Sequence, residues 1–334
     1  MKILVTGGAG YIGSTVCSAL EDHGHFPIVL DSFVTGRREF ALERTCYEGD
    51  IGDRAVVARI FEQHPDIDCV IHCAALIVVP HSVAQPYEYY LNNVVKSLEL
   101  FRNLDAVGCR RIVFSSSAAV YDTVPDFMVR EESPLAAYSP YARSKVMVES
   151  ILEDMCAATG LQGISLRYFN PIGADPDMRS GAHASDVSHA LGKLVEVASE
   201  REPVFRITGT DWPTRDGTGV RDYIHVWDLA LAHVKAVEMF DDVMSADSES
   251  SHAVINLGTG RGVTVKELVA AFESVIGHTI PKEEAPSRPG DVAGAFANAD
   301  VALKLLGWKA EKTTEEAIFD AMKWNEVRYR TLGY

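Results

Sequence analysis

A tyrosine, a lysine and an upstream serine are the residues of this 334-residue sequence best suited to chemistry. Tyr141 and Lys145 are four positions apart, a spacing that places both side chains on one face of a helix. Lowering the pKa of a tyrosine from ~10 by ~3 units, so that it acts as a base, takes about 4 kcal/mol of phenolate stabilisation. Lys145 and a positive nicotinamide ring would supply it. Ser117 would hydrogen-bond the reacting hydroxyl, so the three residues predict oxidation of a secondary alcohol by a nicotinamide cofactor.

A glycine-rich segment directly after the first apolar run predicts where that cofactor binds. Its glycines recur every three residues, at Gly7, Gly10 and Gly13. Glycine there permits a tight turn and lets a pyrophosphate approach the N-terminus of the next helix. Asp31 ends the second apolar run, where a carboxylate would accept hydrogen bonds from the adenosine ribose and repel a 2′-phosphate. The sequence therefore favours NAD, although Arg37 and Arg38 follow closely and could reach a 2′-phosphate.

The elements that must position these residues alternate between β-branched apolar runs and helical patterns. Strands are expected at 3–6, 28–31, 46–50, 69–74, 111–115 and 164–168, with helices at 11–23, 54–64, 85–107 and 140–159. Such alternation predicts right-handed βαβ units and an α/β fold with a Rossmann-type, doubly wound parallel sheet. We expect an NAD-binding domain over 1–170, rejoined by part of 220–258, and a smaller α/β substrate domain over 171–334, with the active site between them.

The second half has a looser pattern, which still predicts several elements. Helices are expected at 191–201, 265–276 and 313–330, and strands at 204–207 and 254–257. Thr313 and Glu316 have the spacing of a capping box, which would fix the start of the last helix.

Composition and charge narrow the class of protein. A net charge of −16 opposes nonspecific binding to nucleic acid or to an anionic membrane, so anionic ligands must be met by local basic groups. No apolar run reaches the ~18 residues that span a bilayer, and the first residues run straight into the glycine segment without an export signal. The six cysteines include no CxxC pair and are expected to be reduced, without a metal site. A cytoplasmic enzyme is the expectation.

Three longer segments carry a family resemblance. Residues 209–226, which read GTDWPTRDGTGVRDYIHV, closely resemble a signature of UDP-galactose (UDP-glucose) 4-epimerases of the extended short-chain dehydrogenase/reductase superfamily. Tyr168–Pro171 and Arg288–Asp291 also look like epimerase segments, and the similarity extends over essentially the whole chain. The resemblance implies tightly held NAD, a UDP-sugar substrate and a homodimer built on two helices per subunit.

The same resemblance assigns site residues. Those implied to contact the cofactor, besides the glycines, Asp31, Tyr141 and Lys145, are Tyr11, Ile12, Asp50, Ile51, Ala74, Ala75, Asn92 and Phe169. Those implied to contact the nucleotide sugar, besides Ser117, are Asn170, His189, Arg221, Arg288, Asp291 and Ala295. In the implied mechanism Tyr141 takes the proton of the 4-hydroxyl as C4 gives up hydride. The resulting 4-keto sugar turns over and receives the hydride on its opposite face.

Several positions depart from the family pattern. Ile77 stands where a lysine is common, Ala119 where a threonine is usual, and Asp122 where Tyr-Gly is usual. His189-Ala-Leu-Gly192 replaces a familiar segment near the uracil. Ala295 aligns with a gatekeeper that is tyrosine in enzymes restricted to unsubstituted hexoses, so a small residue there leaves room for a 2-N-acetyl group. UDP-GlcNAc/UDP-GalNAc and other modified nucleotide sugars thus remain open as substrates.

Other activities are compatible with parts of the pattern. A dehydratase or decarboxylase begins with the same C4 oxidation but needs an acid near the serine, whereas Ala118 and Ala119 follow Ser117 here. A net dehydrogenase would consume free NAD. A noncatalytic NAD-binding protein of the same fold would have no need of Tyr141 or Lys145.

Overall fold

The computed structural model describes residues 1–183, 189–247, 250–287 and 292–333. Its larger sheet has seven strands in the order β12-β7-β5-β4-β1-β2-β3, and every neighbouring pair is parallel. The strands are β1 (Lys2–Thr6), β2 (Phe26–Asp31), β3 (Thr45–Glu48), β4 (Ile67–His72), β5 (Arg111–Ser115), β7 (Gln162–Tyr168) and β12 (His252–Leu257). This confirms the predicted α/β class and parallel sheet.

Helices cover both faces of this sheet, and each face has its own apolar core. One face packs against α1 (Tyr11–Asp22), α8 (Val226–Glu238), α9 (Phe240–Ala246) and α11 (Asp300–Leu306). The other packs against α2 (Arg54–Gln63), α5 (Lys96–Val107) and α6 (Pro140–Ala158). Successive side chains of β1 alternate between the cores, since Ile3 and Val5 face the first and Leu4 the second. Such two-sided burial explains the continuous apolar runs of the strands.

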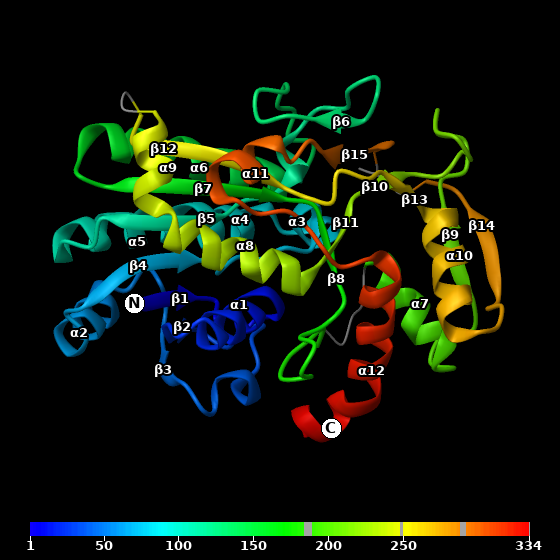
Figure 1. The fold of residues 1–334 in the computed structure, drawn as a ribbon, viewed down its shortest axis with the longest axis horizontal. Coiled ribbons are helices and arrows are strands. Elements are labelled where there is room, and N and C mark those ends of the chain that lie inside the picture. The colour runs from blue at the N-terminus through cyan, green and yellow to red at the C-terminus, as the bar shows by residue number, and fades with distance from the viewer. Residues whose placement is uncertain (184–188, 248–249, 288–291, 334) are drawn as a thin grey trace.

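A smaller lobe lies beside the carboxyl ends of these strands, at the right of Figure 1. Its four-stranded sheet has the order β13-β10-β15-β6, with β13 (Val263–Thr264), β10 (Val220–Arg221), β15 (Gly294–Ala297) and β6 (Met128–Val129). Two strand pairs join it, β8 (Asn170–Ile172) with β11 (Tyr223–His225) and β9 (Phe205–Thr208) with β14 (Lys282–Ala285). Helices α7 (Ala190–Ala198), α10 (Val265–Ile276) and α12 (Thr314–Leu332) share a third core. The capping box of Thr313 and Glu316 is formed at the start of α12.

The helix expected over 85–107 is interrupted. The chain instead forms α3 (Val79–Ala84), α4 (Pro86–Tyr89), a π-helical turn η2 (Tyr90–Val95) and then α5. Asn93 lies in that wide turn, and its side-chain amide accepts from the backbone N–H of Leu76 (2.8 Å) and donates to the Leu76 carbonyl (2.9 Å). The wider turn thus ties the helix to the segment after β4, and such turns are frequent at functional sites.

The strand expected over 69–74 also differs, because β4 ends at His72. His72 is fully buried and hydrogen-bonds the hydroxyls of Thr6 (2.7 Å) and Ser97 (2.9 Å). Burial lowers the pKa of His72 to about 3, which keeps the ring neutral. His72 therefore joins β1, β4 and α5, as expected for a structural histidine. The short strands β6, β14 and β15 were not anticipated, because each pairs with a strand that is far away in the sequence.

Candidate active site

The glycine segment forms a tight turn at the end of β1. Gly7 has a φ of +69°, and a Cβ there would lie 2.7 Å from the backbone nitrogen of Ala74. A Cβ on Gly13 would lie 2.1 Å from the carbonyl oxygen of Gly7, so only glycine lets α1 approach the turn. Helix α1 begins at Tyr11, and its N-cap, Gly10, offers no side-chain hydrogen bond to the first N–H groups. These N–H groups are therefore suited to a pyrophosphate, so the turn fits the predicted dinucleotide.

Asp31 lies beside this turn at the end of β2. Its carboxylate accepts hydrogen bonds from the backbone N–H groups of Ala9 (2.9 Å) and Phe33 (2.8 Å). Arg38 is one of the two arginines that could bind a 2′-phosphate. It forms an ion pair with Glu48 on β3 (2.6 Å) and lies over the Phe33 ring. Binding of NADP by Arg38 would have to break this pair, whereas the Asp31 carboxylate is already fixed next to the turn.

Lys96 links two of the residues expected to contact the cofactor, and the sequence reasoning missed it. Its ammonium forms an ion pair with Asp50 (2.6 Å) and donates to the side-chain carbonyl of Asn92 (3.3 Å). Asn92 and Lys96 are one helical turn apart, which is the signal that could have revealed the link. Ile51 is buried nearby in the core under α2 and α5. Lys96 therefore holds together one cluster of polar side chains, which also includes Asp50 and Asn92.

The segment after β4 lies against the glycine turn. Ala74 is the residue that a Cβ on Gly7 would strike, so the two backbones pass in close contact. Ala74 and Ala75 are half-buried, whereas Ile77 is 61% exposed. The structure therefore brings the small residues to the turn and leaves the isoleucine, where a lysine was expected, facing outward.

Ser117, Tyr141 and Lys145 come together where β5 ends against the first turns of α6. The Lys145 ammonium donates to the backbone carbonyl of Ser115 (2.7 Å) and lies 6.0 Å from the centre of the Tyr141 ring. The Ser117 hydroxyl lies close enough to the Tyr141 phenol to lower its pKa, and it accepts a hydrogen bond from the backbone N–H of Ala119 (3.2 Å). All three residues are at least 90% buried. This is the spatial arrangement that the spacing predicted, and their catalytic roles remain predictions.

The environment of Tyr141 and Lys145 shifts the pKa of each side chain in the cofactor-free chain. Burial raises the pKa of Tyr141, and the neighbouring Ser117 hydroxyl offsets only part of this. Burial lowers the pKa of Lys145 to about 8, against the opposing effects of Cys73 and Glu149. The phenol is therefore protonated at neutral pH, so base catalysis needs a further positive charge beside it. A bound oxidised nicotinamide ring has that charge.

Three of the residues expected to bind substrate, Asn170, Arg221 and Ala295, lie on strands of the smaller lobe. Arg221 on β10 is the direct neighbour of Ala295 on β15. The Arg221 guanidinium donates to the carbonyls of Val220 (2.7 Å), Val292 (3.2 Å) and Ala293 (3.3 Å). Ala295 packs with Phe169 in a small apolar cluster that also includes Val120, Tyr121 and Ala118, which follow Ser117. Asn170, next to Phe169, donates its backbone N–H to the carbonyl of Asp222 (3.0 Å).

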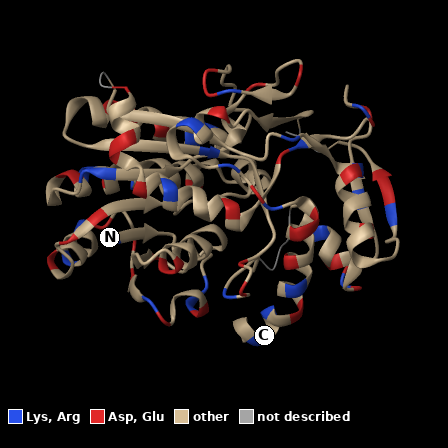
Figure 2. Cartoon of the chain, viewed as in Figure 1, with Lys and Arg blue, Asp and Glu red and all other residues tan. Residues whose placement is uncertain are grey.

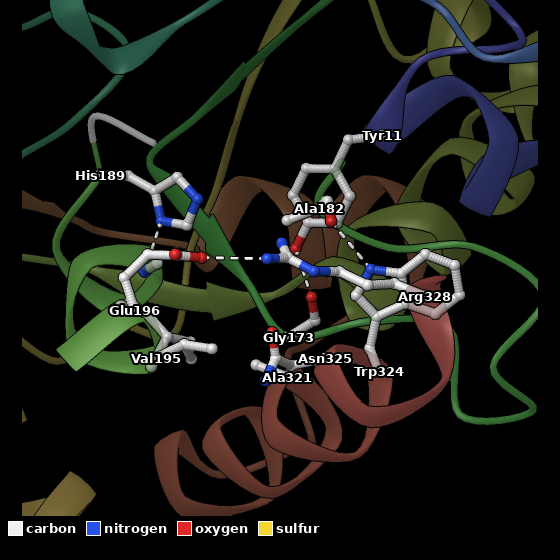
Figure 3. A pocket seen from close by; sticks show the side chains of 12 residues that line it. Tyr11, Gly173, Ala182, His189, Val195, Glu196, Ala321, Trp324, Asn325 and Arg328 are labelled. Carbon is white, nitrogen blue, oxygen red and sulfur yellow. Dashed lines mark hydrogen bonds and ion pairs between the residues drawn. The ribbon is translucent and has the colours of Figure 1, made fainter. Parts of the chain in front are cut away.

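His189 lies at the N-terminus of α7. It caps this helix by accepting from the N–H of Gly192 (3.1 Å), and its side chain is exposed. Together with Tyr11 and Arg328 it lines a cavity between α7 and α12, and the Tyr11 hydroxyl donates to the carbonyl of Gly173 (2.7 Å) (Figure 3). None of the three catalytic candidates lines this cavity. Arg288 and Asp291 lie outside the described residues.

Figure 2 shows that Lys and Arg positions are interspersed with Asp and Glu positions along the same elements, α12 among them. A phosphate must therefore be met by individual groups such as Arg221. Within the four described stretches, the helices include none that could cross a membrane. Within the same residues no cluster of His, Cys, Asp or Glu has the composition of a metal site. All six cysteines, each of them described, are free thiols.

Comparison with known proteins shows the family to which the chain belongs. The family model described as "NAD dependent epimerase/dehydratase family" matches residues 3–258. The UDP-glucose 4-epimerase of Bacillus subtilis (strain 168) is 42% identical over 335 aligned positions, covering 97% of this chain and 96% of the relative. The structure of UDP-glucose-4-epimerase from Stenotrophomonas maltophila, with bound NAD and formylated UDP-arabinopyranose, superposes with a TM-score of 0.92 at 37% identity and covers 99% of both chains.

A third relative has a broader name. The UDP-Glc/GlcNAc 4-epimerase of Campylobacter jejuni superposes with a TM-score of 0.80 at 34% identity, covering 97% of this chain and 99% of that one. The similarity therefore extends over nearly the full length of this chain and of each relative, beyond the segments that carry the motifs. The chain belongs to the NAD dependent epimerase/dehydratase family and, within it, to the UDP-glucose 4-epimerases.

Proposed function

We propose that the protein is an NAD-dependent isomerase that inverts C4 of a UDP-hexose, interconverting UDP-glucose and UDP-galactose. The observation that carries the proposal is the convergence of Ser117, Tyr141 and Lys145 in a chain that is similar to UDP-glucose 4-epimerases along its whole length. The Stenotrophomonas relative holds NAD and a UDP-sugar derivative together, which supports both ligands here. Free thiols suit a reducing compartment, so we also propose a cytoplasmic location, which cell fractionation would test.

Each of the three residues has a defined task in this reaction. NAD, when bound, accepts the C4 hydride and later returns it. Tyr141 takes the proton of the 4-hydroxyl and gives it back, and Ser117, which lies beside the phenol, orients that hydroxyl. Lys145, anchored on the Ser115 carbonyl, supplies a fixed positive charge that favours the phenolate.

The nucleotide part of the substrate would be held by the smaller lobe. Arg221 presents a planar, forked cation on β10 of the small sheet, a geometry suited to a diphosphate. On the basis of the family resemblance, we propose four further contacts to the nucleotide sugar: Asn170, His189, Arg288 and Asp291. A grip on the diphosphate leaves the hexose ring able to turn over between the two hydride transfers.

The experiment that tests the function uses the purified protein without added cofactor. We expect NMR to show conversion of UDP-galactose to its C4 epimer, with NAD supplied by the protein itself. Consumption of added NAD in proportion to substrate would instead identify a net dehydrogenase. Failure to convert UDP-galactose and UDP-GalNAc, even after NAD is added, would require the substrate assignment to be withdrawn.

The size of the residue at position 295 supports a second candidate substrate pair, UDP-GlcNAc and UDP-GalNAc. Ala295 contributes only a methyl group to the cluster with Phe169, and one relative is named for both glucose and GlcNAc forms. An Ala295→Tyr variant is expected to lose about tenfold or more of kcat/KM for UDP-GalNAc relative to UDP-galactose, because the phenol would fill the space of the N-acetyl group. Ala270→Tyr, on the exposed face of α10, is the matched control.

Equal losses for both sugars in Ala295→Tyr would show that position 295 does not sort substrates by the 2-substituent. No conversion of UDP-GalNAc by the wild type would restrict the protein to unsubstituted hexoses.

An apolar strip on one helix supports the homodimer that the resemblance implies. Leu91, Val95 and Leu98 follow one another at helical spacing along η2 and α5 and are 36%, 47% and 41% exposed. Helix α6 packs beside them and exposes Met147 to 43%. We propose that these two helices form the interface, since contiguous exposed apolar residues mark association sites. Analytical ultracentrifugation should find a dimer for the wild type and a monomer for Val95→Glu, and a monomeric wild type contradicts the proposal.

A further inference from the structure

Helix α6 presents a third polar residue in line with the two catalytic candidates. Tyr141, Lys145 and Glu149 follow one another at intervals of four, so all three lie on the face of α6 that meets the end of β5. Each contacts one of three consecutive serines. Tyr141 lies beside Ser117, Lys145 donates to the carbonyl of Ser115, and the Ser116 hydroxyl donates to the carboxylate of Glu149. Two hydrogen bonds, from Lys145 and to Glu149, thus fix the end of β5 to α6.

Glu149 is itself held by an arginine of the neighbouring strand β7. Nε of Arg167 donates to Oε1 (3.0 Å) and Nη2 donates to Oε2 (2.6 Å), which is a bidentate pair. Relative exposures are 6% for Glu149 and 5% for Arg167. An ion pair so buried contributes little net stability compared with apolar residues of similar volume. Its position directly behind the catalytic candidates therefore calls for another explanation.

The pair also connects α6 to the smaller lobe. Nη1 of Arg167 donates to the Tyr121 hydroxyl (3.0 Å) and to the backbone carbonyl of Glu131 (3.1 Å). The Tyr121 hydroxyl donates to the side-chain carbonyl of Asn256 on β12 (2.6 Å), whose backbone N–H donates to the Glu131 carboxylate (2.8 Å). The segment 121–131 contains β6, which pairs with β15, the strand that carries Ala295. One continuous network therefore joins the catalytic helix to the sheet around the proposed sugar site.

We propose that Glu149, locked by Arg167, is a positioning residue of the epimerase reaction: it holds Ser116 and Ser117 in register with α6 and places a negative charge one helical turn from Lys145. The proposal rests on the proposed function of the three catalytic candidates. It extends the tyrosine and lysine pattern by one turn, to a residue that touches neither substrate nor cofactor.

The charge of Glu149 has a predictable effect on Lys145. Titratable groups facing Lys145 are His72 and Cys73 at the end of β4, and Tyr141 and Glu149 on α6. Burial lowers the pKa of Lys145 to about 8, and the charge of Glu149 is one of the two influences that raise it. Removing that charge lowers this pKa further. Lys145 favours the phenolate only when protonated, so its contribution to activity is present below its pKa and is lost as the pH rises through it.

Around Glu149 the charged or titratable groups are Arg167 on β7 and His252 on β12, whose pKa burial lowers. Arg167 stays protonated throughout the neutral range, and burial keeps His72 neutral. A shift of the alkaline limb of the pH–activity profile, which is the fall in activity at high pH, can therefore be attributed to Lys145.

Three variants and a control test the proposal in the NAD-loaded protein. Glu149→Gln removes the charge and is expected to lower kcat for UDP-galactose about tenfold or more, with KM within about twofold, because displaced catalytic groups lose rate rather than binding. The alkaline limb of its pH profile should move down by about half a unit or more. Ser116→Ala and Glu149→Asp, which keep the charge, should lower kcat by about threefold or more without moving the limb.

Asp228→Asn is the control for a purely structural loss. Asp228 is buried and accepts from the backbone N–H groups of Glu311 and Lys312, away from the catalytic candidates. It should lower the melting temperature without changing kcat per folded, NAD-loaded molecule or the pH profile. A Glu149→Gln variant with kcat within twofold of the wild type and an unmoved limb overturns the proposal. If that variant does not fold, kcat values within twofold for both Ser116→Ala and Glu149→Asp overturn it.

A wild type that converts no UDP-sugar would be a failure of the proposed function, and the role of Glu149 can still be tested. Lys145 is expected to contact bound NAD, so its protonation should appear in the pH dependence of NAD affinity of the cofactor-free protein. A downward shift of that dependence in Glu149→Gln supports the influence of Glu149 on Lys145. An unchanged dependence refutes it.

Discussion

Replacing Tyr141 with phenylalanine is expected to lower kcat for UDP-galactose about 10³-fold or more and to leave NAD content and melting temperature near those of the wild type. General acid–base catalysis contributes about 10²–10⁴-fold, and here one phenol would serve both proton transfers. Phenylalanine keeps the buried ring and removes only the hydroxyl beside Ser117. Steady-state kinetics with NMR detection of the C4 epimers measures the loss.

Tyr138→Phe is the matched control for this variant. Tyr138 precedes α6, is 55% exposed, and donates its hydroxyl to Asp122 (2.5 Å). Its kcat should stay within about twofold of the wild type, because mutations of exposed groups away from the reaction change little. Unchanged activity in Tyr141→Phe would remove the tyrosine from the mechanism, and NAD retention without any activity in the wild type would favour the noncatalytic alternative.

Replacing Gly13 with alanine is expected to weaken NAD binding about 100-fold, so that the purified variant loses its cofactor and its activity together. The added Cβ would lie 2.1 Å from the Gly7 carbonyl oxygen, and α1 would have to move away from the turn that receives the pyrophosphate. Overpacking of this kind costs about 1–3 kcal/mol, and a loss at the upper end corresponds to about 100-fold in affinity. Chromatographic measurement of bound NAD and titration of the cofactor-free protein give the two quantities.

Gly160→Ala is the matched control for the glycine turn. A Cβ at Gly160 meets only the flexible side chain of Arg110, at 3.4 Å. It should bind NAD as the wild type does. Full NAD retention in Gly13→Ala would mean that the close approach of α1 to the turn is not required for the cofactor, and the dinucleotide site would have to be sought elsewhere.

The parts of the site that the sequence predicted are those whose residues are close along the chain. Gly7 and Gly13 flank one turn, and Tyr141 and Lys145 occupy one helical face, so spacing alone brings each pair together. The alternation of strands and helices likewise follows from local patterns, because burial on both faces of a parallel sheet demands continuous apolar runs. Fold class, parallel sheet and the capping box of α12 are confirmed on this basis.

Prediction from the sequence failed where a contact depends on how separate elements pack. The π-helical turn at Tyr90–Val95 was expected to be ordinary helix, since nothing local shows that Asn93 must bond Leu76. Lys96 was passed over because its partner Asp50 lies on another element. Burial also changed the electrostatic expectation, since the pKa of Tyr141 is raised in the cofactor-free chain.

The sequence by itself therefore determined the chemical types of the site and the sheet that carries them, because both are encoded in short-range spacing and periodicity. Only the tertiary structure decided that Glu149 and Arg167 stand behind the catalytic candidates, and that Ala295 lies beside Phe169 and Arg221. Residues far apart in the chain meet there because the layers of one sheet and the strands of the smaller lobe are packed together. Such a packing has no local period from which it could be predicted.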